Sequence, residues 1–529
     1  MNSTKVEFSF KTDVLIIGSG LAGTRAAISV LENSANLNVS VLSFPVRFRG
    51  SSSFSDFTNG WGLQYPISDE DKSTMKKDII NVGKSYCDEK LVDVLVENAA
   101  LRVRELFKWG VKFRKTEEGN LYRFKGCFST NPRDILAYDM DNLKNVFKKI
   151  LSDSRVEYFE GWLVINIAQK ENLWVTTAIN NKGITAHFVS KAVVISPGGG
   201  AGIYRYNLNY PYNMGHGYRL GAILGLKPEN MEFVQYIFGV IYNEYVRFLL
   251  NQKVISAARK IYDPHGFAFM KRTFGNKYRE LLSERMTHAP FSCSFNDHEV
   301  DLVLFKKSRD NDFGPLEIRL DELDEDNIEK DIFLRTWVKW FKKRCKSNSL
   351  NFSHCAHAFN GGFLIKPDAG TDKPGLFIAG ELATGMHGAD RVGGTMLLSC
   401  MVFGEIAGTS TVKYINSNSF AESNTIDRFI LGTSESGTFF GKDEIKHLTK
   451  ELMYSNWKYI SIIRTRKGLR SYLKYLNSLE SYIEGTGVRE EELYDFYNLL
   501  STCVTSKMIT EAALKNNRTV GSHYIEDGK

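Results

Sequence analysis

The stretch DVLIIGSGLAGTRAAISVLE, residues 13–32, decides the fold. Residues 14–17 form an apolar run without alternation, which is typical of a parallel strand buried on both faces. Three glycines follow at the turn into a helix. Gly18 permits a tight turn, Gly20 lets the backbone approach a pyrophosphate, and Gly23 lets the helix pack closely on the strand. The pattern predicts a phosphate-binding turn at a helix N-terminus.

The residues after this turn complete a βαβ unit. An Ala-rich helix follows, and a second strand is expected at NVSVLSF, residues 38–44. This strand ends on Ser43 where an acid usually holds the ribose hydroxyls, so we expect a weaker ribose contact through the serine hydroxyl. A helix cap without a ligand explains one of the three glycines but not all of them. The interpretation is therefore dinucleotide binding.

Size and composition indicate a multidomain globular protein. The 529 residues exceed the roughly 250–300 that a single core can organise, so two to four domains are expected. Apolar residues make up 43% and charged residues 24%, which is ordinary for a globular chain. Lys and Arg number 68 against 61 acids, a net charge of +7 without a long basic block. No nucleic-acid partner is expected.

The cysteine spacing and the hydropathy of the chain indicate whether a metal site, a signal peptide or a membrane helix is expected. The seven cysteines are scattered and never form C-x-x-C, so we expect reduced thiols and no metal site. The polar N-terminus lacks the apolar core of a signal peptide. The apolar window 233–250 contains Asn243, Glu244 and Arg247, and it falls short of the roughly 20 apolar residues of a membrane helix. We expect a cytoplasmic protein without a membrane span.

Two further glycine-rich segments follow apolar runs. They are AVVISPGGGAGIY, residues 192–204, and the pattern of strand, Gly-Glu, loop and long helix in residues 373–409. Three such strand ends, separated by hundreds of residues, predict one discontinuous domain with an insertion. G-x-S-x-G, H-E-x-x-H and Walker patterns do not occur, so acyl transfer, zinc hydrolysis and phosphoryl transfer have no support.

Five stretches resemble the flavoprotein family of fumarate reductase, succinate dehydrogenase and L-aspartate oxidase. They are GSGLAG (18–23), NMEFVQY (230–236), HAFNGG (357–362), PGLFIAGE (374–381) and HGADRVGG (387–394). The chain length and the C-terminal stretches 456–473 and 512–524 look most like L-aspartate oxidase.

The resemblance implies an α/β fold with three parts. These are a Rossmann-like FAD-binding domain formed by 1–240 and 351–423, an inserted α+β capping domain at 241–350, and a C-terminal helical domain at 424–529. Residues 50–53, Gly-Ser-Ser-Ser, lack the histidine that carries covalent flavin in some members, so non-covalent FAD is expected. The expected cofactor-binding residues are Gly18, Ser19, Gly20, Ala22, Gly23, Ser43, Ser52, Ser53, Val164, Ser196, Gly198, Gly380, Glu381, Arg391, Gly394, Thr395 and Leu397.

Four residues are implied at the substrate. Arg391 matches the arginine that grips a substrate carboxylate, a task that suits a planar guanidinium. His357 matches the histidine that binds the same group. His387 begins the arginine loop, where it orients the loop or contacts flavin. Arg285, in ELLSERMTHA, is the candidate proton-transfer group from the capping domain.

Several departures from the family pattern point to an altered substrate. After MEFVQ the family reads F-H-P-T, whereas residues 236–239 read Tyr-Ile-Phe-Gly, which is expected to put Ile237 and Phe238 at one end of the pocket. A Thr-Glu or Ser-Glu pair is replaced at 256–257 by Ser-Ala, and the loop 124–143 lacks the family pattern. A buried carboxylate without partners costs several kcal/mol, so a second carboxylate should bind poorly. Asp390 stands in place of the family's asparagine, and an ion pair between Asp390 and Arg391 would weaken carboxylate binding by Arg391.

Three functions stay open. The first is an FAD oxidoreductase acting on an amino acid or monocarboxylate, with oxygen or a diffusible electron acceptor. The second is a reductase of carbon–carbon double bonds supplied with electrons by a partner. The third is a degenerate FAD-binding subunit. Retention of His357, Arg391 and Arg285 favours an enzyme, and the oligomeric state is left open.

Overall fold

A computed structural model describes residues 8–48, 50–55, 60–242, 245–420 and 439–528. Its centre is a mixed sheet in the order β6-β2-β1-β9-β8-β7, with β16 also paired to β9. The pairs β6–β2, β2–β1, β1–β9 and β9–β16 are parallel, while β8 is antiparallel to both β9 and β7. The strands are β1 Phe8–Ile17, β2 Val39–Ser43, β6 Val156–Glu160, β7 Trp162–Lys170, β8 Leu173–Asn180, β9 Thr185–Ile195 and β16 Leu376–Ile378.

The three predicted glycine-rich segments each follow a strand of this sheet. β1, β9 and β16 run parallel, so their carboxyl ends lie at one edge. The three glycine-rich segments therefore belong to one sheet, as a discontinuous domain requires. The apolar window 233–250 contains two strands of a different sheet: β11 Val234–Tyr242 and β12 Tyr245–Leu249.

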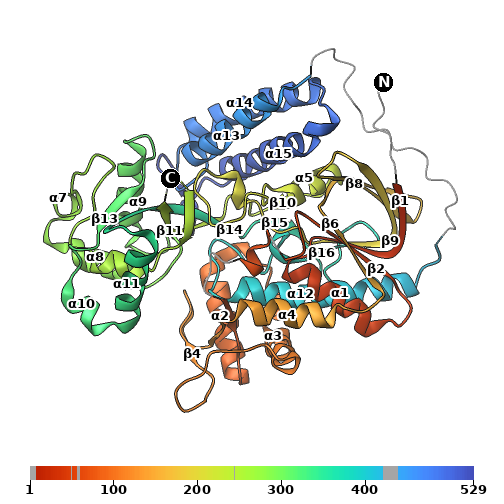
Figure 1. The fold of residues 1–529 in the computed structure, drawn as a ribbon, viewed down its shortest axis with the longest axis horizontal. Coiled ribbons are helices and arrows are strands. Elements are labelled where there is room, and N and C mark those ends of the chain that lie inside the picture. The colour runs from red at the N-terminus through yellow and green to blue at the C-terminus, as the bar shows by residue number, and fades with distance from the viewer. Residues whose placement is uncertain (1–7, 49, 56–59, 243–244, 421–438, 529) are drawn as a thin grey trace.

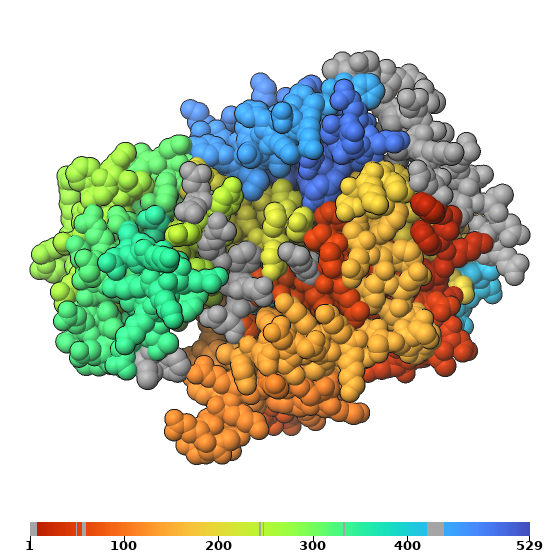
Figure 2. Space-filling view, viewed as in Figure 1, coloured from red at the N-terminus to blue at the C-terminus, as the bar shows by residue number. Residues whose placement is uncertain are grey.

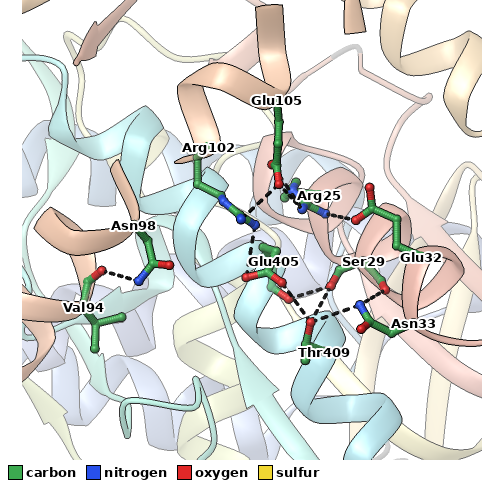
Figure 3. Close-up of polar contacts among 10 residues, drawn as sticks. All are labelled: Arg25, Ser29, Glu32, Asn33, Val94, Asn98, Arg102, Glu105, Glu405 and Thr409. Carbon is green, nitrogen blue, oxygen red and sulfur yellow. Dashed lines mark hydrogen bonds and ion pairs between the residues drawn. The ribbon is translucent and has the colours of Figure 1, made fainter. Parts of the chain in front are cut away.

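Helices α1 (Leu21–Asn33) and α12 (Thr395–Asn416) pack against each other on the sheet, and α3 (Glu89–Trp109) lies beside them (Figure 1). Small residues permit the close approach, because a Cβ at Gly408 would lie 2.4 Å from the carbonyl oxygen of Ala26. Figure 3 shows the polar network that joins the three helices. Arg25 contacts Glu105, and Arg102 bridges Glu105 and Glu405.

The inserted region forms one end of the molecule, green in Figure 1, with its own hydrophobic core. Its sheet has the order β12-β11-β14-β13. The expected boundaries at 240 and 350 fall inside β11 and β14, so these strands continue from one domain into the next. The remaining elements are β13 Leu316–Arg319, β14 Ser349–Phe359, α6 Gln252–Ala257, α7 Met270–Phe274, α8 Tyr278–Arg285, α9 His298–Arg309, α10 Glu325–Lys330 and α11 Ile332–Cys345.

Three C-terminal helices cover the opposite side of the sheet from α1 and α12 (Figure 1). They are α13 Lys442–Tyr459, α14 Arg466–Gly485 and α15 Leu493–Lys515, and α15 packs on α5, His216–Ile223. Figure 2 shows the same three regions in space-filling form, with the blue helices above and the green capping region at one end. The expected fold class is confirmed: an α/β FAD-type domain, an inserted α+β region and a C-terminal helical region.

The shorter elements surround this frame. They are α2 Asp69–Gly83, α4 Met140–Ile150, β3 Trp61–Gln64, β4 Arg123–Phe124, β5 Asp134–Ala137, β10 Pro228–Glu229, β15 Gly362–Leu364, β17 Ala383–Thr384, β18 Ile463–Arg464 and β19 Tyr524–Ile525. Among the described residues, α12 alone is long and apolar enough to cross a membrane by length and composition. Its most apolar window is 67% buried within the protein, as in a core helix.

Candidate functional site

A cavity of about 460 Å³ lies at the carboxyl edge of the central sheet, between the sheet, the start of α12 and the inserted region. It collects most of the residues that the sequence predicts for a cofactor and a substrate. The predicted residues that line it are Gly18, Ser19, Gly20, Ala22, Ser52, Ser53, Val164, Ser196, Gly198, His357, Gly380, Glu381, Arg391, Gly394 and Leu397.

The glycine turn after β1 has the geometry that a dinucleotide requires. Gly18 adopts φ +105°, and a Cβ there would lie 2.4 Å from the carbonyl oxygen of Ser196. Helix α1 begins after Gly20 without a side-chain cap and without an acid in its first turn. The N–H groups at this end are therefore available to an anion such as a pyrophosphate. The residues present fit a bound dinucleotide.

Three predicted cofactor residues do not line the cavity. Gly23 serves packing, because a Cβ there would lie 2.0 Å from the carbonyl oxygen of Gly18. The buried hydroxyl of Ser43 has no hydrogen-bond partner among the described residues, and its neighbours Leu42 and Phe44 line the cavity instead. Thr395 donates its hydroxyl to the carbonyl of Val392 at 2.6 Å, in the turn that starts α12. Their roles at the cofactor stay predictions.

Arg391 presents unpaired donors to the cavity. Its Nε donates to Oε1 of Gln235 at 2.9 Å, while its two Nη groups make no hydrogen bond within the described part of the chain. Gln235 is 1% exposed, and its Nε2 also lacks a partner there. Both residues line the cavity. Donors without acceptors at one place indicate an anionic ligand.

His357 lines the same part of the cavity. Burial, together with the charge of Arg391, lowers the pKa of His357 to about 4. The imidazole is therefore neutral at pH 7. It can donate one hydrogen bond to a carboxylate without adding a positive charge.

Asp390 does not pair with Arg391. Its Oδ2 accepts hydrogen bonds from Ser292 at 2.5 Å and from Ser294 at 3.1 Å, both in the inserted region. Burial raises the pKa of Asp390 to about 7, although the two serine donors lower it. The guanidinium of Arg391 therefore keeps its donors for a ligand.

Arg285 lies behind the cavity wall and does not line the cavity. Its side chain is fully buried and pairs through two nitrogens with Asp301, which also accepts from His354 at 2.8 Å. Arg285 also donates to the carbonyls of His288 (2.7 Å) and Ala289 (3.3 Å). Its donors are therefore used to hold the segment that ends at Ala289.

His387 is also absent from the cavity lining. Both of its ring nitrogens are buried without a hydrogen-bond partner among the described residues. Burial, and secondarily Arg391, lowers the pKa of His387 well below its usual range. A buried neutral ring at the start of the arginine loop suits a role in orienting that loop.

Part of the cavity wall is apolar. This wall contains Ile237, Leu249, Ala289 and Pro290. The expectation that Phe238 shares this wall is wrong, because successive residues of a strand point to opposite faces, and Phe238 packs in the core of the inserted region. Ala257 is buried in the same core. Of the apolar substitutions noted in the sequence, only the one at position 237 faces the cavity.

Cys127 lines the cavity and was not among the expected site residues. Its thiol accepts the backbone N–H of Ala289 at 3.2 Å, and its carbonyl accepts the N–H of Gly393 at 2.8 Å. The only signal in the sequence was the unusual loop 124–143 that contains it.

Residues 13–397 match the family described as FAD binding domain. A Methanocaldococcus jannaschii protein described as an uncharacterized FAD-dependent oxidoreductase is 26% identical, over 98% of this chain and 94% of its own. L-aspartate oxidase of Pseudomonas aeruginosa is 24% identical, over 98% and 96%. A solved E. coli quinol fumarate reductase structure has a TM-score of 0.77 at 20% identity, over 98% and 92%.

Proposed function

The chain belongs to the FAD binding domain family and is an FAD-dependent oxidoreductase, and we propose that it transfers hydride between FAD and a monocarboxylate or amino acid with an apolar far end. The resemblance to fumarate reductase and L-aspartate oxidase flavoproteins, expected from the motifs, is confirmed by the relatives found. When bound, FAD supplies the hydride acceptor or donor.

The hydrogen-bond donors of Arg391 and Gln235 that have no acceptor among the described residues are the main evidence for a carboxylate substrate. A carboxylate between them gives acceptors to the Arg391 Nη groups and to the Gln235 Nε2, which is otherwise buried without an acceptor among the described residues. His357, neutral beside them, adds a third donor. A single carboxylate uses these groups fully.

The apolar part of the cavity wall supports a substrate with one carboxylate only. A second carboxylate against Ile237, Leu249 and Pro290 would lack partners there. Burying it would cost several kcal/mol. At about 3 kcal/mol, a dicarboxylate should bind roughly 100-fold more weakly than a monocarboxylate of similar size.

The segment after β2 supports non-covalent FAD. Ser51, Ser52 and Ser53 line the cavity from this segment, and a serine hydroxyl is not the histidine nitrogen that carries flavin in related enzymes. Acid precipitation should therefore leave the yellow flavin in the supernatant. The cytoplasmic location expected from the sequence is part of the same proposal.

Ligand binding tests this function before any substrate is known. The FAD-loaded protein should be titrated with hydrocinnamate, with succinate and with hydrocinnamide while the flavin spectrum is followed. Hydrocinnamate should perturb the spectrum at the lowest concentration, because it has one carboxylate and an apolar end. The neutral amide should bind weakly, since it lacks the charge for Arg391. Equal binding of succinate would contradict the proposal.

A further inference from the structure

The groups that could exchange a proton with a substrate carbon can be located from the cavity lining. The titratable side chains that line it in the described part of the chain are Cys127, Tyr212, His216, His357, Glu381, Arg391 and Cys400. Several are committed elsewhere. His216 bonds Ser501 and Asn498, and Glu381 accepts the N–H of Phe359.

Two more lie at the nucleotide end. Tyr212 packs on Phe44, directly after β2. Cys400 lies near Gly380, at the glycine end of β16. Cys127 and His357 remain, and both lie close enough to Arg391 for its charge to lower the pKa of each. Arg391 also acts on Cys400, but that thiol lies at the glycine end.

Cys127 is fixed between the substrate arginine loop and the wall of the inserted region. The N–H of Ala289 points at its sulfur, and its own carbonyl holds Gly393, two residues beyond Arg391. Burial raises the pKa of Cys127, although the hydrogen bond from Ala289 and the charge of Arg391 both favour the thiolate. At neutral pH the side chain is therefore a thiol that carries a proton.

Gln235 gives a second, independent indication of a ligand beside this thiol. The buried residue Gln235 lines the cavity, and its Nε2 has no acceptor among the described residues. A carboxylate oxygen that accepts from Gln235 and Arg391 brings its adjacent carbon to the end of the cavity that Cys127 lines. The other candidate, Arg285, does not reach the cavity.

We propose that Cys127 is a catalytic residue that donates the proton from Sγ to the carbon next to the carboxylate when a 2,3-unsaturated monocarboxylate is reduced. The proposal rests on the function proposed above and names a substrate class for its reductive direction. The S–H bond breaks and a C–H bond forms, with the electron pair supplied by the carbanion that hydride addition leaves on that carbon. The thiolate then regains a proton from water.

Iodoacetate tests the position of the thiol without needing turnover. It is a monocarboxylate whose reactive carbon is the one next to the carboxylate. When Arg391 binds it, the sulfur of Cys127 forms an S–C bond, iodide leaves and the thiol proton goes to buffer. We expect Cys127 in FAD-loaded protein to react about tenfold faster with iodoacetate than with neutral iodoacetamide, a preference worth about 1.4 kcal/mol of binding.

Arg391→Gln should abolish this preference. Cys345, half-buried on α11, is the internal control, because Arg391→Gln should not change its labelling. Peptide mass spectrometry gives both rates in one sample. Labelling of Cys345 with no reaction at Cys127, or equal rates for the two reagents at Cys127, would overturn the placement of the thiol.

Reoxidation of reduced flavin tests the proton transfer itself. Photoreduced FAD-loaded protein should be mixed anaerobically with crotonate and with cinnamate, and the return of the visible flavin band followed. Cys127→Ala should slow this return about 100-fold or more, as expected for loss of a general acid. Cys345→Ala should match wild type. Cys127→Ser, which keeps the size of the side chain, should retain FAD and remain slow.

The outcomes separate the two proposals. Wild-type rates in Cys127→Ala with normal FAD content would overturn the donor role. Selective iodoacetate labelling with no reoxidation by any 2-enoate would also overturn it, while the carboxylate site would stand. If labelling shows no dependence on Arg391, the carboxylate site proposed above fails as well.

Discussion

Replacing Arg285 with methionine is expected to lower the free energy of unfolding by about 3–5 kcal/mol, the usual cost of leaving one member of a buried ion pair alone. Arg285 and Asp301 both have fully buried side chains, and two guanidinium nitrogens contact the carboxylate. Methionine fills similar space, so the loss reflects charge more than volume. Asp301 would keep only its hydrogen bond from His354.

The matched control is Lys72→Met. Lys72 also pairs with an acid, Glu97 at 2.8 Å, but that pair is exposed, with side-chain exposures of 27% and 65%. Its loss should cost less than about 1 kcal/mol. Urea unfolding followed by circular dichroism at equal FAD saturation gives both values.

The pH dependence gives a second check. Burial alone would raise the pKa of Asp301, but Arg285 and His354 outweigh it and hold the pKa well below the ordinary value. The carboxylate therefore stabilises the fold above the unfolded pKa of about 4, and this stabilisation is lost as pH falls below it. The difference between wild type and Arg285→Met should shrink towards low pH. A variant as stable as wild type that no longer reduces its flavin with substrate would refute this account and favour Arg285 as the proton-transfer group.

Three further predictions concern the cavity. Arg391→Gln should keep normal FAD but weaken monocarboxylate binding by about 3–5 kcal/mol, or at least 100-fold, because two charge-assisted hydrogen bonds are lost. An unchanged dissociation constant in a spectral titration would contradict this. Gly20→Val should fold, since φ at this position is −68°. It should bind no FAD, because the valine side chain enters the phosphate-binding turn. A yellow purified variant would show that this turn does not bind FAD. Burial raises the pKa of Asp390 to about 7 in the folded state, so stability should fall as pH rises from about 4 to 7. Asp390→Asn should flatten that part of the curve of melting temperature against pH, and identical slopes would exclude the effect.

The sequence predicts the nucleotide half of the site because its signals are local. An apolar strand followed by glycine marks each strand end, and parallel strands bring these ends to one edge. Gly18, Gly198 and Gly380 accordingly all line the cavity. The same local logic gave the correct placement of Arg391, which lies just before the start of α12.

The substrate half depends on contacts between distant segments, which the motifs do not encode. Cys127 reaches the site because Ala289, 162 residues later, folds against it. Arg285 does not line the cavity, because its side chain forms a buried ion pair with Asp301 on α9. Phe238 was misplaced because the sequence did not show that residues 234–242 form a strand with alternating faces.

The most direct test of the central claim is anaerobic reduction of the bound flavin by substrate. The purified yellow protein should be mixed without oxygen with a panel of amino acids and saturated monocarboxylates, including hydrocinnamate, butyrate, L-aspartate and succinate, and the visible flavin band followed. Bleaching by an acid with one carboxylate and an apolar end, lost in Arg391→Gln, is the predicted result. Bleaching by L-aspartate or succinate as fast as by any monocarboxylate would contradict the account.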